Sequence, residues 1–450
     1  MRHLVRRVTA AAIAAAIALA PAAAAAQAKR GIGLIRDAEA EKLVRDYARP
    51  ILQAAGLGGA NIQIKIVNDG SFNAFVADQR HIFINAGTLI DTRTPNELIG
   101  VIAHETGHLA GNHLVRLREE IIRTQILSAI AMIGGVAASA AGGSGQGAVA
   151  SVLGGQQIGT RSILAYARSE ETTADRAAIT YLDKTGQSGK GMLDTFERLA
   201  DQQLFASAYG DPYMMSHPLA ADRIAALQEV AQASKNYGRT DDPALQLRHD
   251  LVRAKFIAFT GSAQQTQRAY PDADGSLPAA YARAVLTFRY GDPKSAVAAT
   301  EALIKADPKN PFFQELKGQI LLETGTPKLA IEPLKKAVAM APKEGLIRVM
   351  LGHAMVASED ERLLKEAVKE LTKGIGDDPD QPIGYRQLAI AYARLGDNAM
   401  ADLATAQGSF ASGDVKAAKQ YAERARANLK TGSPAWLRAD DIVTYKNPIR

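Results

Sequence analysis

The feature that most constrains the fold is a repeat in the C-terminal half of the chain, with a period of about 34 residues. Three kinds of residue recur at this spacing: Gly291 with Gly325, Ala296 with Ala330, and Pro308 with Pro342. The series continues at a slightly longer spacing with Ala367 and Pro379, and Ala401 follows Ala367 at the original spacing. The extra residues fall near the polar stretch 358–361, where a loop would tolerate them. Because three separate markers agree on one period, this half of the chain is built from repeated units.

A unit of this length with Gly at the turn, a small Ala in its second helix and Pro at its end is typical of tetratricopeptide repeats. Each unit is a helix–turn–helix that buries its apolar face only by stacking on its neighbours. We predict an α-solenoid over residues 278–430, with three clear units to residue 379 and a fourth, less regular one. A C-terminal tail, 431–450, would follow. The alternative is a generic helical bundle. A solenoid implies a binding surface for polypeptide and no chemistry of its own.

The segment 1–28 has the pattern of a secretory signal. Three arginines precede an Ala/Ile run, Pro21 interrupts that run, and the segment ends in the small-residue pattern Ala26-Gln27-Ala28. We expect cleavage after Ala28 and a mature chain that works in the periplasm. The alternative is an uncleaved anchor helix, but the apolar run is short for a membrane span and Lys29-Arg30 follows it at once.

Composition excludes several classes of function. The formal net charge is +6, and three of the positive charges lie in the leader, so the remainder is close to balanced and nucleic-acid binding is not expected. The chain has no cysteine, which rules out disulfides, thiolate metal ligands, a cysteine nucleophile and a lipoprotein anchor. Its 450 residues are 47% hydrophobic, enough to bury cores in more than one domain.

Residues 29–237 are predicted to form a mixed helical and strand domain. A helical spacing of apolar residues extends from Arg36 to about Ala55, and three short strands follow at 61–67, 73–77 and 81–85, which we expect to form a small antiparallel sheet. A helix then begins after Thr94-Pro95-Asn96 and continues through Leu117. The predicted fold class is therefore α+β, mostly α, followed by the solenoid. Residues 238–277 are expected to be a helical linker.

That last helix contains the segment 104–108, which reads HETGH. His104 and His108 are four residues apart, so both imidazoles lie on one helix face and can reach one metal ion. Glu105 lies beside that face, where it can contact a metal-bound water and take its proton during attack on a peptide carbonyl. Gly107 is costly inside a helix, and a close approach of another segment would explain it. The alternative is a buried helix with two hydrogen-bonded histidines.

A catalytic zinc site needs a third protein ligand, which in this chain must be His, Glu or Asp. His113 is a poor candidate, because nine residues past His104 it would face the opposite side of the same helix. Downstream, Glu171 and Asp175 are one helical turn apart, so one can bind metal while the other orients a ligand histidine. Spacing alone leaves a solvated helix face as the alternative.

The motif His104-Glu-x-x-His108, followed further along the chain by Arg168-x-x-Glu171-x-x-Ala174-Asp175, resembles the M48 family of zinc metallopeptidases. The resemblance implies a zincin-like domain over 29–237 and one Zn²⁺ per chain, with Glu171 as the third ligand. It also implies that Asp175 is the carboxylate that orients a ligand. The domain would be an endopeptidase with Glu105 as its catalytic acid and base.

Two further segments resemble elements of that family. The segment Asn73-Ala74-Phe75 is similar to the edge strand along which substrate is thought to lie. Ser216-His217-Pro218-Leu219 with Arg223 is similar to a later His-Pro…Arg element. His217 would then act at the metal, either polarising the substrate carbonyl or occupying the fourth ligand position and holding the enzyme latent. The alternative is a histidine that only supports the helix that starts at Ala220.

The resemblance also implies clients and partners. Substrates would be unfolded or misassembled envelope proteins, chiefly outer-membrane β-barrels, and the barrel-assembly machinery would be a partner. A second hypothesis is a chaperone or scaffold whose zinc site is latent, although a scaffold has no need of Glu105. The segment 121–155 joins the two motif helices, and its apolar run is short for a span. We expect it to form a helical hairpin that packs on the domain or contacts a membrane surface. A membrane-spanning hairpin is the alternative.

Overall fold

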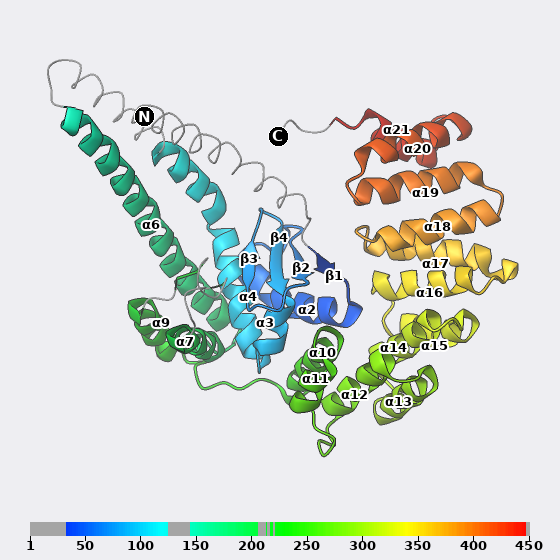
Figure 1. Ribbon diagram of the computed structural model, residues 1–450, viewed down its shortest axis with the longest axis horizontal. Helices are drawn as coiled ribbons and strands as arrows, with labels where there is room; N and C mark the ends of the chain where they lie inside the picture. The colour runs from blue at the N-terminus through cyan, green and yellow to red at the C-terminus, as the bar shows by residue number, and fades with distance from the viewer. Residues whose placement is uncertain (1–32, 125–144, 206–212, 214–216, 219–220, 447–450) are drawn as a thin grey trace, which may run out of the picture.

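The computed structural model describes residues 33–124, 145–205, 213, 217–218 and 221–446, and most of them are helical (Figure 1). The predicted signal segment 1–28 lies outside the described residues, and so do residues 125–144 of the predicted hairpin and the last four residues of the tail. Within the described part of the chain, no helix has the length and apolar character needed to cross a membrane.

The small sheet has four strands in the order β1-β2-β4-β3. Their bounds are β1 Leu34–Ile35, β2 Gln63–Val67, β3 Ala74–Val76 and β4 His81–Asn85. The prediction of an antiparallel sheet is wrong in one pairing, because β2 and β4 run parallel, with Ile64 opposite Ile82 and Ile66 opposite Ile84. The other two pairings are antiparallel. The β3–β4 hairpin folds back so that β4 inserts beside β2, which leaves β3 at an edge of the described sheet.

One face of this sheet is covered by helices that build the first core. The isoleucines of β2 and β4 pack with apolar residues of α2 (Ala38–Ala54) and α4 (Pro95–Ala110), among them Leu98 and Ile102, which are fully buried. Helix α4 starts where the sequence predicted, because Thr94 caps it by accepting a hydrogen bond from the backbone N–H of Glu97 and Pro95 occupies its first turn. The short α3 (Ala86–Asp91) connects β4 to this helix.

Helix α4 ends earlier than predicted. It stops at Ala110, Gly111 and Asn112 form a turn, and a second helical stretch occupies 113–124. Asn112 has a φ of 53°, the left-handed conformation that Asn tolerates better than most residues. The turn breaks the periodicity on which the placement of His113 was based, so the expectation that His113 faces away from the motif histidines is wrong.

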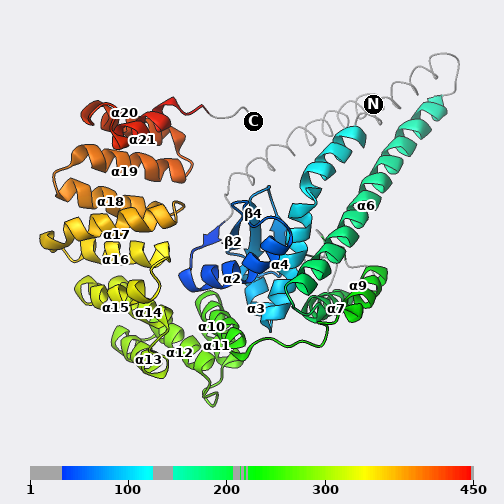
Figure 2. The same ribbon diagram turned by 180° about the vertical axis from the view of Figure 1, so that it is seen from behind.

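Three helices complete the N-terminal part on the side of α4 away from α2. They are α6 (Gly145–Lys184), α7 (Lys190–Phe205) and α9 (Ala221–Ala233). In both ribbon views α6 extends well beyond the sheet, and its C-terminal half lies beside α4 (Figures 1 and 2). Gly107 allows α4 and α6 to approach each other closely. A Cβ on this residue would lie 2.8 Å from the carbonyl oxygen of Ala174 in α6, which confirms the expected close approach.

The C-terminal half is a solenoid of paired helices, as the repeat predicts. The helices are α12 (Leu277–Tyr290), α13 (Pro293–Ala306), α14 (Pro311–Glu323), α15 (Pro327–Met340), α16 (Gly345–Ala357), α17 (Leu364–Asp377), α18 (Pro382–Arg394), α19 (Asn398–Ala411), α20 (Val415–Asn428) and α21 (Pro434–Thr444). The marker residues Ala296, Ala330 and Ala367 are fully buried in the second helices of their pairs. The extra residues of the longer repeat precede α17, where a short 3-10 turn, η1 (Glu361–Leu363), is formed. Residues predicted as a tail form α21, which packs on α20.

The predicted linker consists of α10 (Pro243–Thr260) and α11 (Ala263–Ala269). Helix α10 shares residues with both cores: Val252 and Phe256 pack in the core around the sheet, and Leu251 and Ala254 pack with the first repeats. The solenoid begins at α12, next to α10 and α11. Its middle helices, α16 to α18, lie on the side of the sheet that carries β1 (Figure 1). Ion pairs connect the two parts there, between Arg45 and Glu344 and between Lys65 and Asp380.

Candidate metal centre

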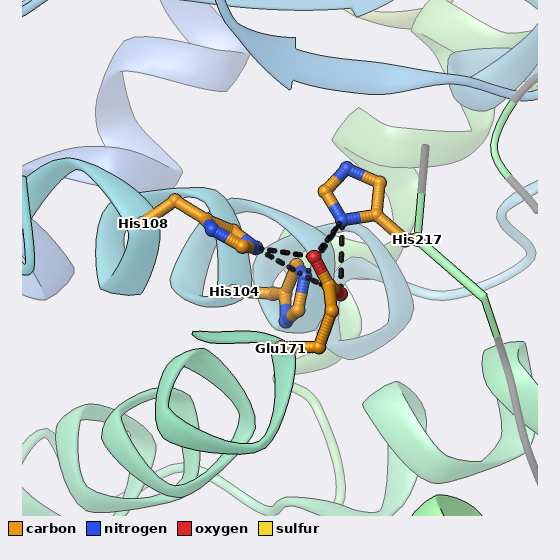
Figure 3. Close-up of side chains that lie close together, drawn as sticks. All are labelled: His104, His108, Glu171 and His217. Atoms are coloured by element: carbon orange, nitrogen blue, oxygen red, sulfur yellow. Dashed lines mark hydrogen bonds and ion pairs between the residues drawn. The ribbon is translucent and has the colours of Figure 1, made fainter. Parts of the chain in front are cut away.

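Four side chains from three segments converge at the C-terminal half of α4 (Figure 3). They are His104 and His108 of α4, Glu171 of α6, and His217, and one ligand atom from each lies within 4.8 Å of the others. Three of them were predicted as metal ligands, and the fourth was predicted to act at the metal. His104, Glu171 and His217 are buried, and the side chain of His108 is 13% exposed.

The distances join the nitrogen and oxygen atoms that a metal ion would bind. His104 Nε2 and His108 Nε2 are 3.0 Å apart, and they lie 3.4 Å and 3.2 Å from the two carboxylate oxygens of Glu171. His217 Nδ1 lies 3.0 Å from both oxygens of Glu171 and 3.3 Å from His104 Nε2. A set of imidazole nitrogens and one carboxylate suits a transition metal such as zinc. The residues present therefore fit a metal ion.

A second layer of polar contacts fixes this arrangement. Asp175 Oδ1 lies 2.9 Å from His104 Nδ1, the nitrogen that points away from the converging atoms. Arg223 of α9 holds Asp175 through two nitrogens, at 2.5 Å and 2.9 Å, and its Nη1 is 2.9 Å from Glu171. Such a contact fixes the orientation and tautomer of a ligand histidine. The structure thus brings together both residues that were predicted to support the site.

The titration behaviour of these groups reflects their burial and their contacts. Burial lowers the pKa of His104, but contacts with Asp175 and Glu171 outweigh it and raise that pKa to about 9. Burial lowers the pKa of His108 to about 3, so this imidazole is neutral, as a metal ligand must be. Burial opposes ionisation of Glu171, yet contacts with the three histidines hold its pKa well below the ordinary value. A metal ion entering the site would displace the proton on His104.

Glu105 lies beside the cluster and is fully buried. Neither carboxylate oxygen has a hydrogen-bond partner among the described residues, and His217 Nε2 lies 3.6 Å from Glu105 Oε1. Burial raises the pKa of Glu105, although electrostatic interactions with His217 and His104 oppose the shift. A buried carboxylate without a partner, next to a set of metal ligands, is suited to exchange protons with a water molecule there.

His217 lies across the cluster from α4, on a segment preceded by Tyr213. The two rings are 4.8 Å apart and tilted by 34°, and the backbone N–H of His217 donates to the carbonyl of Tyr213. Arg223 also reaches this segment, because its Nη1 donates to the carbonyl of Pro218, 3.1 Å away. The His-Pro…Arg element therefore fixes the position of His217 relative to Glu171 through one arginine.

Two residues that were not predicted to belong to the site, His113 and Glu170, also reach it. His113 is 4% exposed, its Nδ1 lies 3.0 Å from His108 Nδ1, and its Nε2 lies 2.6 Å from Glu170 Oε2. The turn at Gly111–Asn112 permits this, because a Cβ on Gly111 would collide with the imidazole ring of His113. The Gly-Asn pair before His113 was the available signal, since it favours a helix end over a continuous helix.

The strand predicted to receive substrate lies at an edge of the described sheet. β3 pairs only with β4 there, and the predicted segment Asn73–Phe75 covers its first two residues and the residue before it. The ring of Phe75 stacks on Phe83 at 5.2 Å, and Ala74 is buried beside α4. The side-chain oxygen of Asn73 has no hydrogen-bond partner among the described residues. This edge can accept a further strand.

Comparison with known proteins agrees with this geometry. Residues 35–231 match the model of the family described as peptidase family M48. A beta-barrel assembly-enhancing protease of Yersinia pestis is 25% identical over 92% of this chain and 85% of its own length. The protein of the same name from Escherichia coli K12 is 24% identical over 92% of this chain and 84% of its own. Metalloprotease LoiP of the same strain is 28% identical over 42% of this chain and 72% of its own length.

Two of the solved structures that match each cover 36% of this chain. The crystal structure of MamA is 23% identical, with a TM-score of 0.29, over 36% of this chain and 90% of that protein. MamA from Desulfovibrio magneticus RS-1 has a TM-score of 0.32 at 21% identity, over 36% of this chain and 92% of that one. The family match, by contrast, includes all the converging residues and Glu105. Residues 35–231 of this chain are therefore a domain of peptidase family M48, and the protein is a metalloprotease.

Proposed function

We propose that the chain is a zinc-dependent endopeptidase of the periplasm that hydrolyses peptide bonds of misfolded or misassembled envelope proteins. The observation that supports this most directly is the carboxylate of Glu105, which lies beside His104, His108 and Glu171 with no hydrogen-bond partner among the residues that the structure describes. In this proposal residues 1–28 are a cleaved signal, 29–237 the peptidase domain, 238–277 a helical linker and 278–430 the repeats that hold clients. Residues 431–450 are the C-terminal segment.

The proposed reaction assigns one role to each residue. His104, His108 and Glu171 would hold one zinc ion, which when bound supplies a Lewis acid for the scissile carbonyl and for water. Asp175 and Arg223 would keep His104 and Glu171 oriented. The substrate would lie extended beside Asn73, Ala74 and Phe75, paired with the free edge of β3. Glu105 then takes the proton of the attacking water and passes it to the leaving amine.

The names of the relatives support the choice of clients. Proteins called beta-barrel assembly-enhancing proteases match 92% of this chain, across both the peptidase region and the repeats. We therefore propose outer-membrane β-barrel proteins as clients and the barrel-assembly machinery as a partner, with no role for nucleic acid. The segment 121–155 would provide a peripheral membrane contact.

The test is cleavage of casein by the purified, zinc-loaded protein, with zinc content measured for each variant. Wild type is expected to cut casein, and Glu105→Gln is expected to keep zinc while losing activity by roughly 10²–10⁴-fold, the usual contribution of a general acid–base. Asp222→Asn, at an exposed position of α9, is the control and should behave as wild type. Equal cleavage by Glu105→Gln and wild type would refute the proposed role of Glu105.

A second candidate function is a chaperone or scaffold with a latent metal site. It is favoured by the contact of His217 Nδ1 with both oxygens of Glu171, at 3.0 Å each, which puts this nitrogen where a fourth ligand would be. If wild type holds zinc and leaves casein intact while His217→Ala cuts it, the peptidase is latent. If no variant cuts casein although zinc is bound, the scaffold function is preferred.

A further inference from the structure

A cavity of about 660 Å³ lies between the solenoid and the N-terminal segment of the peptidase domain, on the β1 side of the sheet and away from the metal ligands. One wall comes from Ile35 to Ala38, and α10 contributes Phe256 and Phe259. The other wall comes from the first helices of three repeats, α14, α16 and the start of α18, and it is largely apolar, with Leu322, Leu346, Val349, Met350 and Ile383. Its size is in the usual range for a ligand site.

Two buried acceptor atoms in this wall lack partners. Glu315 of α14 is 5% exposed and Gln381, before α18, is 2% exposed, and both line the cavity. Within the part of the chain that the structure describes, Glu315 Oε2 and Gln381 Oε1 have no hydrogen-bond partner. The amide of Gln381 is oriented by its own contact, because its Nε2 donates to the carbonyl of Asp378. A group that pairs with either atom must therefore be a donor.

The cations near these atoms are already engaged. Lys255 of α10 lies 2.5 Å from Asp37 and 3.4 Å from Glu39. Arg36 at the cavity wall is paired with Glu41 and Asp378. Tyr281 donates its hydroxyl to Glu39 at 2.8 Å. The carboxylates here thus outnumber the cations that reach them, and Glu315 forms no ion pair within 4.0 Å among the described residues.

The environment of Glu315 is consistent with a missing cation. Burial raises its pKa to about 8; Lys255 opposes the shift, and Asp37 and Glu39 add to it. A buried carboxyl is costly to ionise unless an opposite charge is close. A docked cation would supply that charge.

We infer that this cavity binds a lysine or arginine side chain of a client polypeptide, with the carboxylate of Glu315 accepting its N–H groups and the apolar wall covering its neighbours. The inference rests on the proposed role of the repeats in holding clients. Unfolded segments offer such side chains between apolar residues, and the long alkyl stem of either residue suits an apolar cavity with acceptors inside it. The cavity would bind the client at a distance from the metal centre where the peptide bond is cleaved.

The test uses two fluorescein-labelled heptapeptides that differ at one position, with a lysine between leucines in the first and norleucine in the second. Binding to the full protein is measured by fluorescence anisotropy in a Glu105→Gln background, so that neither peptide is cut. The lysine peptide is expected to bind at least tenfold more tightly. Glu315→Gln is expected to remove this preference, because the amide keeps the shape of the side chain and loses its charge.

The matched control is Glu332→Gln, on an exposed face of α15 where the side chain is 72% exposed, and it should keep the preference. Thermal unfolding verifies that Glu315→Gln is folded; it should melt no lower than wild type, since a buried acid is removed. Equal binding of both peptides to the unaltered cavity, or a lysine preference that survives Glu315→Gln, overturns the inference. Casein cleavage is measured separately, so a failure of the peptidase activity is distinguished from a failure of this site.

Discussion

At the scale of single residues, His113 and Glu170 extend the metal centre by two contacts. With a metal on His108 Nε2, the proton of that imidazole is on Nδ1, which lies 3.0 Å from His113 Nδ1. His113 must then accept at Nδ1 and carry its own proton on Nε2, which faces Glu170 at 2.6 Å. The tautomer of His108 therefore determines the tautomer of His113. His108 is thereby oriented as His104 is by Asp175.

We predict that His113→Ala lowers metal affinity by roughly 10–100-fold, the usual effect of removing a group that orients a ligand. Competition with a chelator measures this without reference to activity. Glu170→Gln should lose less, because Glu170 contacts His113 and not His108 itself. His81→Ala, at the start of β4 and paired only with Asp78 in the contacts described, is the control and should bind metal as wild type does. Unchanged affinity of His113→Ala would contradict the orienting role.

The raised pKa of Glu315 predicts a pH dependence of stability. Its pKa is about 8 in the folded chain against an ordinary value of 4.5, as burial and the carboxylates of Asp37 and Glu39 dictate. Below about pH 4.5 the residue is protonated in both states, and as the pH rises the unfolded chain loses this proton first. The folded state therefore loses stability between these two values. Melting curves should show Glu315→Gln gaining on wild type as pH rises from 5 to 8, and parallel profiles would refute the shift.

At the scale of elements, the contact between α4 and α6 sets the distance between the two histidines and Glu171. Gly107 permits it, since any side chain there would meet the backbone of Ala174 at 2.8 to 3.3 Å. Ala174 precedes Asp175, so the same contact also determines where Asp175 meets His104. Gly107 thus allows α4 and α6 to pack closely. The stability gained from this packing outweighs the low helix propensity of glycine.

Gly107→Ala is expected to destabilise the protein by about 1–3 kcal/mol, the usual cost of forcing an extra methyl group into a packed interior. The substitution should also weaken metal binding, because α6 must move away from α4. Thermal unfolding and chelator competition measure the two effects. Gly376→Ala in α17 is the matched control, since nothing lies within 4 Å of its Cβ position, and it should be neutral or stabilising. Equal melting of both variants would show that the helices can adjust.

At the scale of the whole molecule, a buried polar cluster joins the peptidase domain to the repeats. Glu39 of α2 accepts from the hydroxyl of Tyr281 in α12 at 2.8 Å, and Lys255 of α10 lies between the two parts. Both Glu39 and Tyr281 are buried, at 5% and 0% exposure. Buried polar groups stabilise a contact only while each has its partner, so this cluster couples the stability of the two domains.

Tyr281→Phe should therefore lower the stability of the whole protein by about 1–3 kcal/mol, because Glu39 loses a donor in a buried setting. Calorimetry gives the overall change. Trp436, the single tryptophan, lies in α21 and reports unfolding of the far end of the solenoid by fluorescence. Tyr290→Phe, at a residue that is 56% exposed, is the control and should have no effect. A loss confined to one of the two signals would refute the coupling.

Patterns along the sequence were enough to predict the local features of the chain. The repeat period predicted the helix pairs, and the HETGH segment with Glu171 and Asp175 predicted the residues that converge. Each of these patterns lies within one or two helices, where spacing decides which side chains share a face. The resemblance to peptidase family M48 rested on the same short motifs.

Features that depend on segments distant in sequence became visible in the folded chain. The parallel pairing of β2 with β4 required β4 to insert between strands, and no alternation of apolar residues encodes strand order. His113 reached His108 because a left-handed residue ends α4, and its partner Glu170 comes from another helix. Within the described residues, the oxygens Glu315 Oε2 and Gln381 Oε1 lack partners because three repeats and the N-terminal segment enclose them. Burial and hydrogen bonding are properties of the packed chain, and for that reason spacing along the sequence could not reveal them.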